Sequence, residues 1–197
     1  EGSREGTLIS ILDKTQTAMG GRLLKKWVSR PLKVRNQIQS RLDAVQDLCD
    51  NKGERKVIIE QLKSVADLER LLSKISTGRA VARDILQLKI SLKNISEIKK
   101  KLGAFTSEAI KRIKENIVDI PDLVLKIDKC INDNFIAGND SYGVINKGYH
   151  AELDEIKDIL INGKTWMENY QSQERRRTGI NSLKVEFNKV FGYYIMI

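Results

Sequence analysis

The sequence feature that most restricts the fold is an unbroken helical pattern that runs from Tyr149 to Thr178. Its apolar residues recur every three or four positions, which is typical of an amphipathic helix. These residues are Leu153, Ile156, Leu160 and, after a skip, Met167 and Tyr170. Thr178 and Gly179 end the pattern. We therefore expect a long helical arm, with the rest of the chain as its base.

A strand-like pattern follows this arm directly. The alternating residues are Leu183, Val185 and Phe187 on the apolar side and Lys184, Glu186 and Asn188 on the polar side. Strict alternation of this kind predicts a half-buried strand. A second β element is predicted over Phe135–Gly148, where apolar runs surround Gly-Asn-Asp-Ser, the composition of a hairpin turn.

The remaining chain predicts helices, since only two prolines interrupt 197 residues. Thr15 or Thr17 can cap a helix that Pro31 closes. Further helices are predicted over residues 34–49, 57–62, 68–76, 85–102, 109–118 and 121–130. Residues 50–53 have the composition of a turn, and residues 7–12 form an apolar run too short for an independent element. The predicted fold class is mainly α: a bundle of long helices with a small β hairpin and the first strands of a second β element.

The net charge of +9 and the pI near 9.5 favour polyanionic partners, because neutralising phosphates releases counterions. The excess of lysine and arginine is spread along the chain, however, which is also typical of a lysine-rich solvated surface. Lys89, Lys93 and Lys99–Lys101 lie mostly off the apolar stripe of their predicted helix. This basic face can lie along DNA, but we interpret it as the solvent-facing side of a bundle helix.

No constellation of residues in the sequence indicates catalysis. His150 is the only histidine, and Cys49 and Cys130 match no metal-ligand spacing. Gly20-Gly21 lacks the surrounding pattern of a phosphate-binding loop, so we interpret it as a site of close approach to another backbone. His150 is interpreted as a helix-start residue. The acidic residues that follow it, and the pair Asp67 and Glu69, suit the positive end of a helix dipole.

Four stretches resemble the central region of the MutS family of DNA mismatch-repair ATPases. They are DKTQTAMGGRLLKKWVSRPL (13–32), DLERLLSKISTGRAVARDILQLK (67–89), GYHAELDEI (148–156) and ERRRTGINSLKVEFNKVFGYYI (174–195). The stretches occur in the family's order and span most of the chain. Lys147 departs from the pattern, since relatives often carry an acidic residue there.

The resemblance implies a helical core and lever domain over residues 1–148, a long lever helix over 149–178 and the beginning of a β clamp over 179–197. It also implies that this chain is a fragment of a larger protein. The mismatch-reading wedge and the ATPase of the family lie in other domains, so no cofactor is expected in this segment. ATP and magnesium are expected in the parent protein, a DNA-dependent ATPase.

The partners that the resemblance implies are double-stranded DNA, a second identical or related subunit, and downstream repair proteins. The clamp of the family touches the DNA backbone without sequence preference. Our candidates for such contacts, from position and charge, are Asn188 and Lys189 near the expected turn before Gly192, and Lys184 on the polar face of the strand. Arg175–Arg177 fit either DNA contact or a stabilising role at the negative end of the helix dipole.

Two alternatives stay open. The apolar stripes also fit a helical scaffold that binds partner helices, with the basic charge serving only to solvate it. A MutS paralogue that acts in recombination rather than repair fits the same motifs. The chain has no apolar run of membrane-spanning length and no signal sequence, so a cytoplasmic protein is expected, nucleoid-associated if bacterial.

Overall fold

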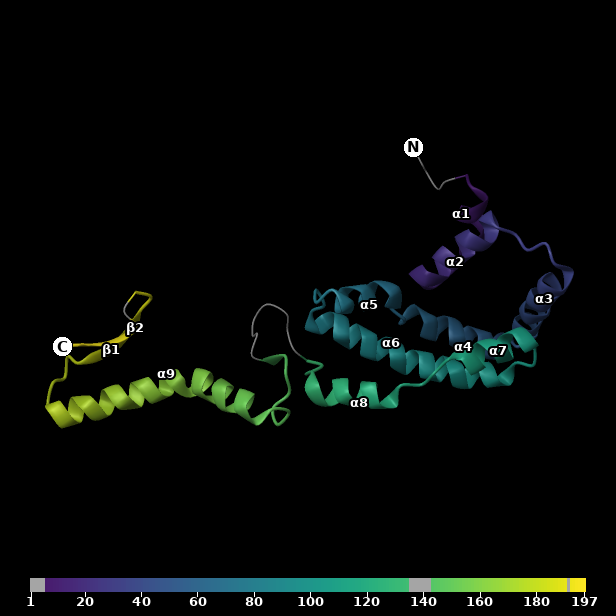
Figure 1. Ribbon diagram of the computed structural model, residues 1–197. Helices are drawn as coiled ribbons and strands as arrows, with labels where there is room; N and C mark the ends of the chain where they lie inside the picture. Colours follow the sequence, from purple (N-terminus) through teal and green to yellow (C-terminus); the bar gives the residue numbers. More distant parts are fainter. Residues whose placement is uncertain (1–5, 135–142, 191) are drawn as a thin grey trace. The chain divides into compact units, whose positions relative to one another are not determined.

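The computed structural model describes residues 6–134, 143–190 and 192–197, and it divides into two compact units (Figure 1). The first unit, Glu1–Val144, is helical. Its elements are α1 (Leu8–Leu12), α2 (Ala18–Ser29), α3 (Arg35–Asp50), α4 (Lys52–Lys63), α5 (Leu68–Ser76), α6 (Ala82–Lys101), the 3-10 turn η1 (Leu102–Ala104), α7 (Glu108–Asn116) and α8 (Pro121–Cys130). The second unit, Ile145–Ile197, contains α9 (Ala151–Thr178), β1 (Lys184–Asn188) and β2 (Gly192–Met196). This confirms the predicted mainly α fold class.

The core of the first unit forms around α6, which packs against α4, α5 and α8. The central cluster of buried side chains comprises Ile58, Val65, Ile98, Leu102, Phe105 and Ile110. Phe105 and Ile110 are each only 3% exposed, because the turn after α6 folds α7 back onto the bundle. The three-and-four spacing read from the sequence therefore corresponds to the observed core face of α6.

Local signals set several helix ends as predicted. Thr17 caps α2, with its hydroxyl accepting a hydrogen bond from the Gly20 amide at 3.0 Å. Asp67, which we expected inside the first turn together with Glu69, instead caps α5 through the amide of Arg70. Gly78 follows α5 with φ +67°, a conformation that residues with a Cβ rarely adopt. Each signal acts within four residues, which is why the sequence alone reveals it.

Two local predictions are wrong. The run at residues 7–12 does form an element, because Thr7 caps the short helix α1 and accepts from the amide of Ser10. The predicted turn over residues 50–53 shrinks to Asn51, since α4 already begins at Lys52. The Asn51 side chain donates to both the carbonyl oxygen and the carboxylate of Asp47, and so replaces a longer loop with a sharp corner. Residues 135–142 of the predicted hairpin lie outside the described residues.

We predicted that the glycine pair at the start of α2 approaches a second backbone. The pair instead meets side chains. A Cβ on Gly20 would lie 3.0 Å from the hydroxyl oxygen of Thr17, and one on Gly21 would lie 3.3 Å from that of Thr15. The threonines before the helix fold back over its first turn and fill the space that a Cβ would need.

Three lysines of α6 correct another expectation, because they bind acidic residues around α8 instead of only facing solvent. Lys89 is 3% exposed and forms ion pairs with Asp128, at 2.8 Å, and with Asp133. Lys93 shares Asp128 at 2.9 Å, and Lys99 binds Asp119 at 2.7 Å. These contacts fasten the chain from 119 to 133 along one side of α6.

Candidate nucleic-acid interface

The second unit leads a long helix into a β hairpin through one tight reversal. The ring of His150 caps the start of α9 by accepting from the Leu153 amide at 3.4 Å, as its interpretation as a helix-start residue predicts. At the other end, Gly179 adopts φ +71° and its amide donates to the carbonyl of Arg175. The reversed chain then buries Leu183, which is 3% exposed, before β1 begins.

Two side chains of α9 bind the backbone of the first strand. The Arg175 Nε donates to the carbonyl of Leu183 at 2.6 Å, and the amide of Val185 donates to the Gln171 Oε1 at 2.8 Å. Gln171 and Arg175 lie four residues apart, so they share one face of the helix. The strand is therefore held against the last turns of α9 by polar contacts as well as by Leu183.

The hairpin pairs β1 with β2 in antiparallel register, with Asn188 opposite Gly192 and Lys184 opposite Met196. Alternation gives it one face with Val185 and Phe187 and another with the polar residues Lys184, Glu186 and Asn188. On the first face, the rings of Phe187 and Tyr193 lie 5.0 Å apart, but Phe187 is 61% exposed. The apolar side of the predicted strand is thus buried at Leu183, just before β1, partly buried at Val185 and exposed at Phe187 near the tip.

On the polar face, Glu186 separates the two predicted contact residues of β1. The Tyr194 hydroxyl donates to the Glu186 carboxylate at 3.2 Å, and this hydrogen bond raises the pKa of Tyr194. The carboxylate therefore has a neighbour on the partner strand and places a negative charge between Lys184 and Asn188.

The structure brings two of the three candidate residues together at the hairpin tip. Asn188 ends β1, and its Oδ1 accepts from the Val190 amide at 2.8 Å, which shapes the turn and leaves the side-chain NH₂ group to donate outward. Lys189 follows in the turn and is exposed. Lys184 lies at the far end of β1, roughly 13 Å away at the rise of an extended strand. The tip thus offers one cation and one amide donor to solvent.

The three arginines at the end of α9 differ in their contacts. Arg175 is committed to the Leu183 carbonyl, and Arg177 forms an ion pair with Glu174 at 2.7 Å. The bond to Glu174 raises the pKa of Arg177 and lowers that of Glu174. Arg176 is exposed and has no ion pair within the described part of the chain. Spacing alone did not separate these roles, because the Leu183 contact requires the chain reversal at Gly179.

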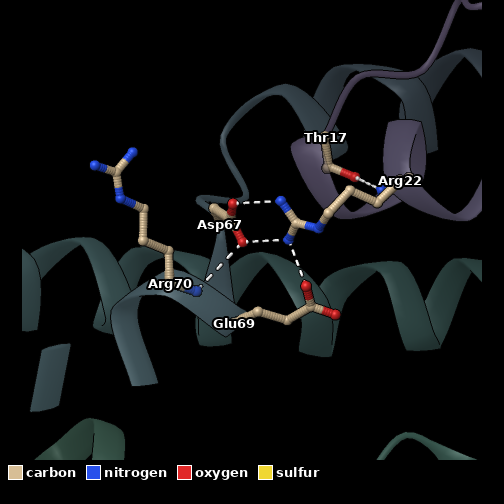
Figure 2. A network of polar contacts seen from close by, with 6 residues as sticks. Thr17, Arg22, Asp67, Glu69 and Arg70 are labelled. Atoms are coloured by element: carbon tan, nitrogen blue, oxygen red, sulfur yellow. Dashed lines mark hydrogen bonds and ion pairs between the residues drawn. The ribbon is translucent and has the colours of Figure 1, made fainter. Parts of the chain in front are cut away.

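A second polar network, in the first unit, was missed by the sequence reasoning (Figure 2). The Arg22 guanidinium binds both oxygens of Asp67, at 2.7 and 2.8 Å, and reaches Glu69 at 2.5 Å. The hydrogen bond from Arg22 lowers the pKa of Asp67, and the two carboxylates raise that of Arg22. Asp67 therefore caps α5 and ties it to α2 at once. The acidic pair has a cation as its partner in addition to the helix dipole that we expected.

Metal-binding and membrane-spanning features are absent from the described residues. Among residues 6–134, 143–190 and 192–197, no group of three or more His, Cys, Asp or Glu side chains is arranged to hold a metal ion. Within the same residues, no helix has the length and apolar character to cross a membrane.

Comparison with known proteins identifies the family of this chain. The MutS domain III family matches residues 1–189. The DNA mismatch repair protein MutS of Halothermothrix orenii is 46% identical over 193 residues, which cover 98% of this chain and 22% of that protein. The MutS proteins of Bacillus licheniformis and Listeria monocytogenes are 44% and 42% identical, over 99% and 98% of the chain and 22% and 23% of their own lengths. The chain thus spans less than a quarter of these relatives, and it belongs to the MutS family, in the region of domain III.

Proposed function

We propose that this segment acts in a DNA mismatch-repair protein and that its β1–β2 hairpin contacts the backbone of duplex DNA without sequence preference. The observation that carries the proposal is the hairpin tip, where Lys189 and the side-chain amide of Asn188 are exposed to solvent and can meet phosphates. Lysine and amide donors are groups that proteins use for phosphate contacts, which position a protein without reading bases.

The electrostatics of the second unit support this role. From Glu174 to the end of the chain there are five lysines and arginines against two glutamates. One of those glutamates is paired within α9 and the other has Tyr194 as a neighbour. Backbone contact needs no base-specific surface, and this suits a protein that must hold DNA of any sequence.

For the whole protein we propose the remaining properties that the family implies. A separate ATPase domain would bind ATP and magnesium, and two identical or related subunits would surround the DNA and recruit downstream repair proteins in the cytoplasm. Residues 1–148, 149–178 and 179–197 would act as core and lever, lever helix and clamp. Relay of nucleotide state through α9 would require an element with two arrangements that both sites bias.

The test is a salt titration of duplex binding by the full-length protein. We expect Lys189→Gln and Lys184→Gln each to lower the slope of log K against log salt by about 0.9 for each phosphate that the variant no longer neutralises. Lys52→Gln is the matched control, because Lys52 is an exposed lysine at the start of α4 in the other unit. Equal slopes in wild type, both hairpin variants and the control would contradict backbone contact by the hairpin.

A helical scaffold is the second candidate, and one observation favours it. The apolar stripe of α3 stays exposed, with Ile38, Leu42 and Val45 between 39% and 55% accessible. Exposed stripes of this kind mark surfaces for other protein segments. Duplex binding that does not depend on salt would favour this scaffold over the DNA role.

The repair assignment itself has a separate test, since a recombination paralogue shares this region. The complete coding sequence should contain a downstream Walker-type ATPase and, for a repair protein, an upstream Phe-x-Glu wedge. Absence of the wedge beside an intact ATPase would favour the paralogue.

A further inference from the structure

The contacts between α9 and β1 carry an inference about how the hairpin is aimed. The hairpin joins the helix through residues 179–183, a short segment that contains one glycine in the left-handed conformation. Two strands alone are marginally stable in water and would pivot on such a joint. Something must therefore hold the hairpin at a set angle to the helix if its tip is to meet DNA in a defined place.

The Gln171–Arg175 pair is placed to do this. Its two side chains bind backbone atoms of Leu183 and Val185, at 2.6 and 2.8 Å, on either side of the residue where β1 begins. Both contacts are partly buried, where a hydrogen bond is costly to leave unmade. Because they come from successive turns of one helix face, they oppose twisting as well as bending at the joint.

We propose that Gln171 and Arg175 are positioning residues that fix the hairpin to the axis of α9, so that movement of the helix carries the hairpin tip with it. The inference rests on the proposed function, because it concerns the same DNA contact. In this arrangement Arg175 acts on DNA through the strand and not through its own charge. Arg176, one position along, is exposed and has no ion pair within the described residues.

The neighbouring arginines give a matched pair of variants in the full-length protein. Arg175→Ala and Arg176→Ala remove the same charge from adjacent positions, but only the first removes the bond to Leu183. We expect Arg175→Ala to bind duplex DNA about 5-fold more weakly than Arg176→Ala, as losing one hydrogen bond of about 1 kcal/mol predicts. The salt plot of Arg175→Ala should run parallel to that of the wild type. A difference that shrinks as salt rises would mean that Arg175 contacts phosphate, and would overturn the positioning role.

Gln171 allows a test without any change of charge in the disrupting variant. Gln171→Leu removes the acceptor for the Val185 amide, so exchange of that amide should accelerate in the protein without DNA, and duplex affinity should fall about 5-fold with an unchanged salt slope. Gln171→Glu keeps an acceptor oxygen and should retain the amide protection of the wild type. Rescue by glutamate separates loss of this bond from general unfolding.

The two readouts distinguish failure of this inference from failure of the proposed function. Unchanged exchange of the Val185 amide in Gln171→Leu would overturn the inference, and would leave DNA contact by Lys189 intact. Faster exchange with no change in duplex affinity, in a protein whose Lys189→Gln variant also binds normally, would remove the hairpin as a DNA contact and the positioning role with it.

Discussion

How far replacement of Lys89 changes the free energy of unfolding depends on how its charge is paired. The ammonium group is buried in the first unit and bound by Asp128 and Asp133. Burial lowers the pKa of Lys89, but the hydrogen bonds with the two aspartates outweigh it and raise the pKa overall. The ion pair is therefore present at neutral pH, and its stabilisation is lost only as an alkaline pH passes the raised pKa.

The exposure and ion pairs of the two aspartates indicate how much stability each variant should lose. Lys89→Met keeps most of the buried aliphatic stem, and neither acidic partner is left buried without a cation: Asp128 keeps Lys93, and the side chain of Asp133 is 62% exposed. We therefore expect a change in the free energy of unfolding within about 1 kcal/mol, since apolar replacement of a buried ion is often neutral. Asp128→Ala leaves the buried ammonium with Asp133 alone, and should cost about 1 to 3 kcal/mol.

Urea unfolding of the 197-residue chain, followed by far-UV circular dichroism, measures both variants and their combination. The double variant should be no less stable than Asp128→Ala, because the ammonium that the aspartate neutralised is gone. A coupling free energy of at least about 1 kcal/mol is expected from this cycle. If Lys89→Met costs as much as Asp128→Ala, the lysine stabilises the bundle by its charge and not by its stem, and the reasoning is refuted.

Three further predictions follow from single contacts. Arg22→Ala should accelerate amide exchange in α2 and leave the exchange rates of α6 unchanged, because Arg22 joins α2 to Asp67. Unaltered exchange in α2 would show that apolar contacts alone hold this helix. Gly179→Ala should lower the free energy of unfolding by about 1 kcal/mol, because Gly179 has a positive φ. Gly163→Ala, inside α9 with open space around it, should raise the free energy of unfolding by a similar amount. Thermal unfolding measures both, and a change in the same direction for the two variants would contradict this. The backbone amides of Ser107 and Thr106 lower the pKa of Asp47 by hydrogen bonding to its carboxylate. The stability that these bonds add is therefore present above the ordinary pKa of an aspartate and is lost as the pH falls through the lower pKa of the folded state. Asp47→Asn should make the free energy of unfolding depend less on pH below about pH 4.

Much of the fold follows from residues close together in the sequence. The helix of the arm is confirmed within two residues at its start, and Thr17, Asp67 and His150 cap the helices that they precede. Alternation also places Lys184 and Asn188 on one face of β1. In each case the deciding interaction spans at most four residues, so the pattern carries the answer.

The candidate site was predictable in position but not in detail. The turn before Gly192 was found from composition, and the structure places Lys189 there. The use of Arg175 was not predictable, because its acceptor reaches it only after the chain reverses at Gly179. The assignment of Lys89 to the solvent side was wrong for a related reason, since an acidic pair from α8 and beyond makes burial of a lysine tolerable.

The sequence by itself determined most of the helices, the strand after the long helix and the family, because periodicity, caps and motifs depend on neighbouring residues. Only the tertiary structure decided which charges are bound and which remain available. Arg22 meets Asp67 across 45 positions and Lys89 meets Asp133 across 44, whereas Arg176 and Lys189 stay exposed. An ion pair forms only where folding brings two distant side chains together. A charged residue in the sequence can therefore bind a partner molecule only if the packed structure leaves its side chain exposed.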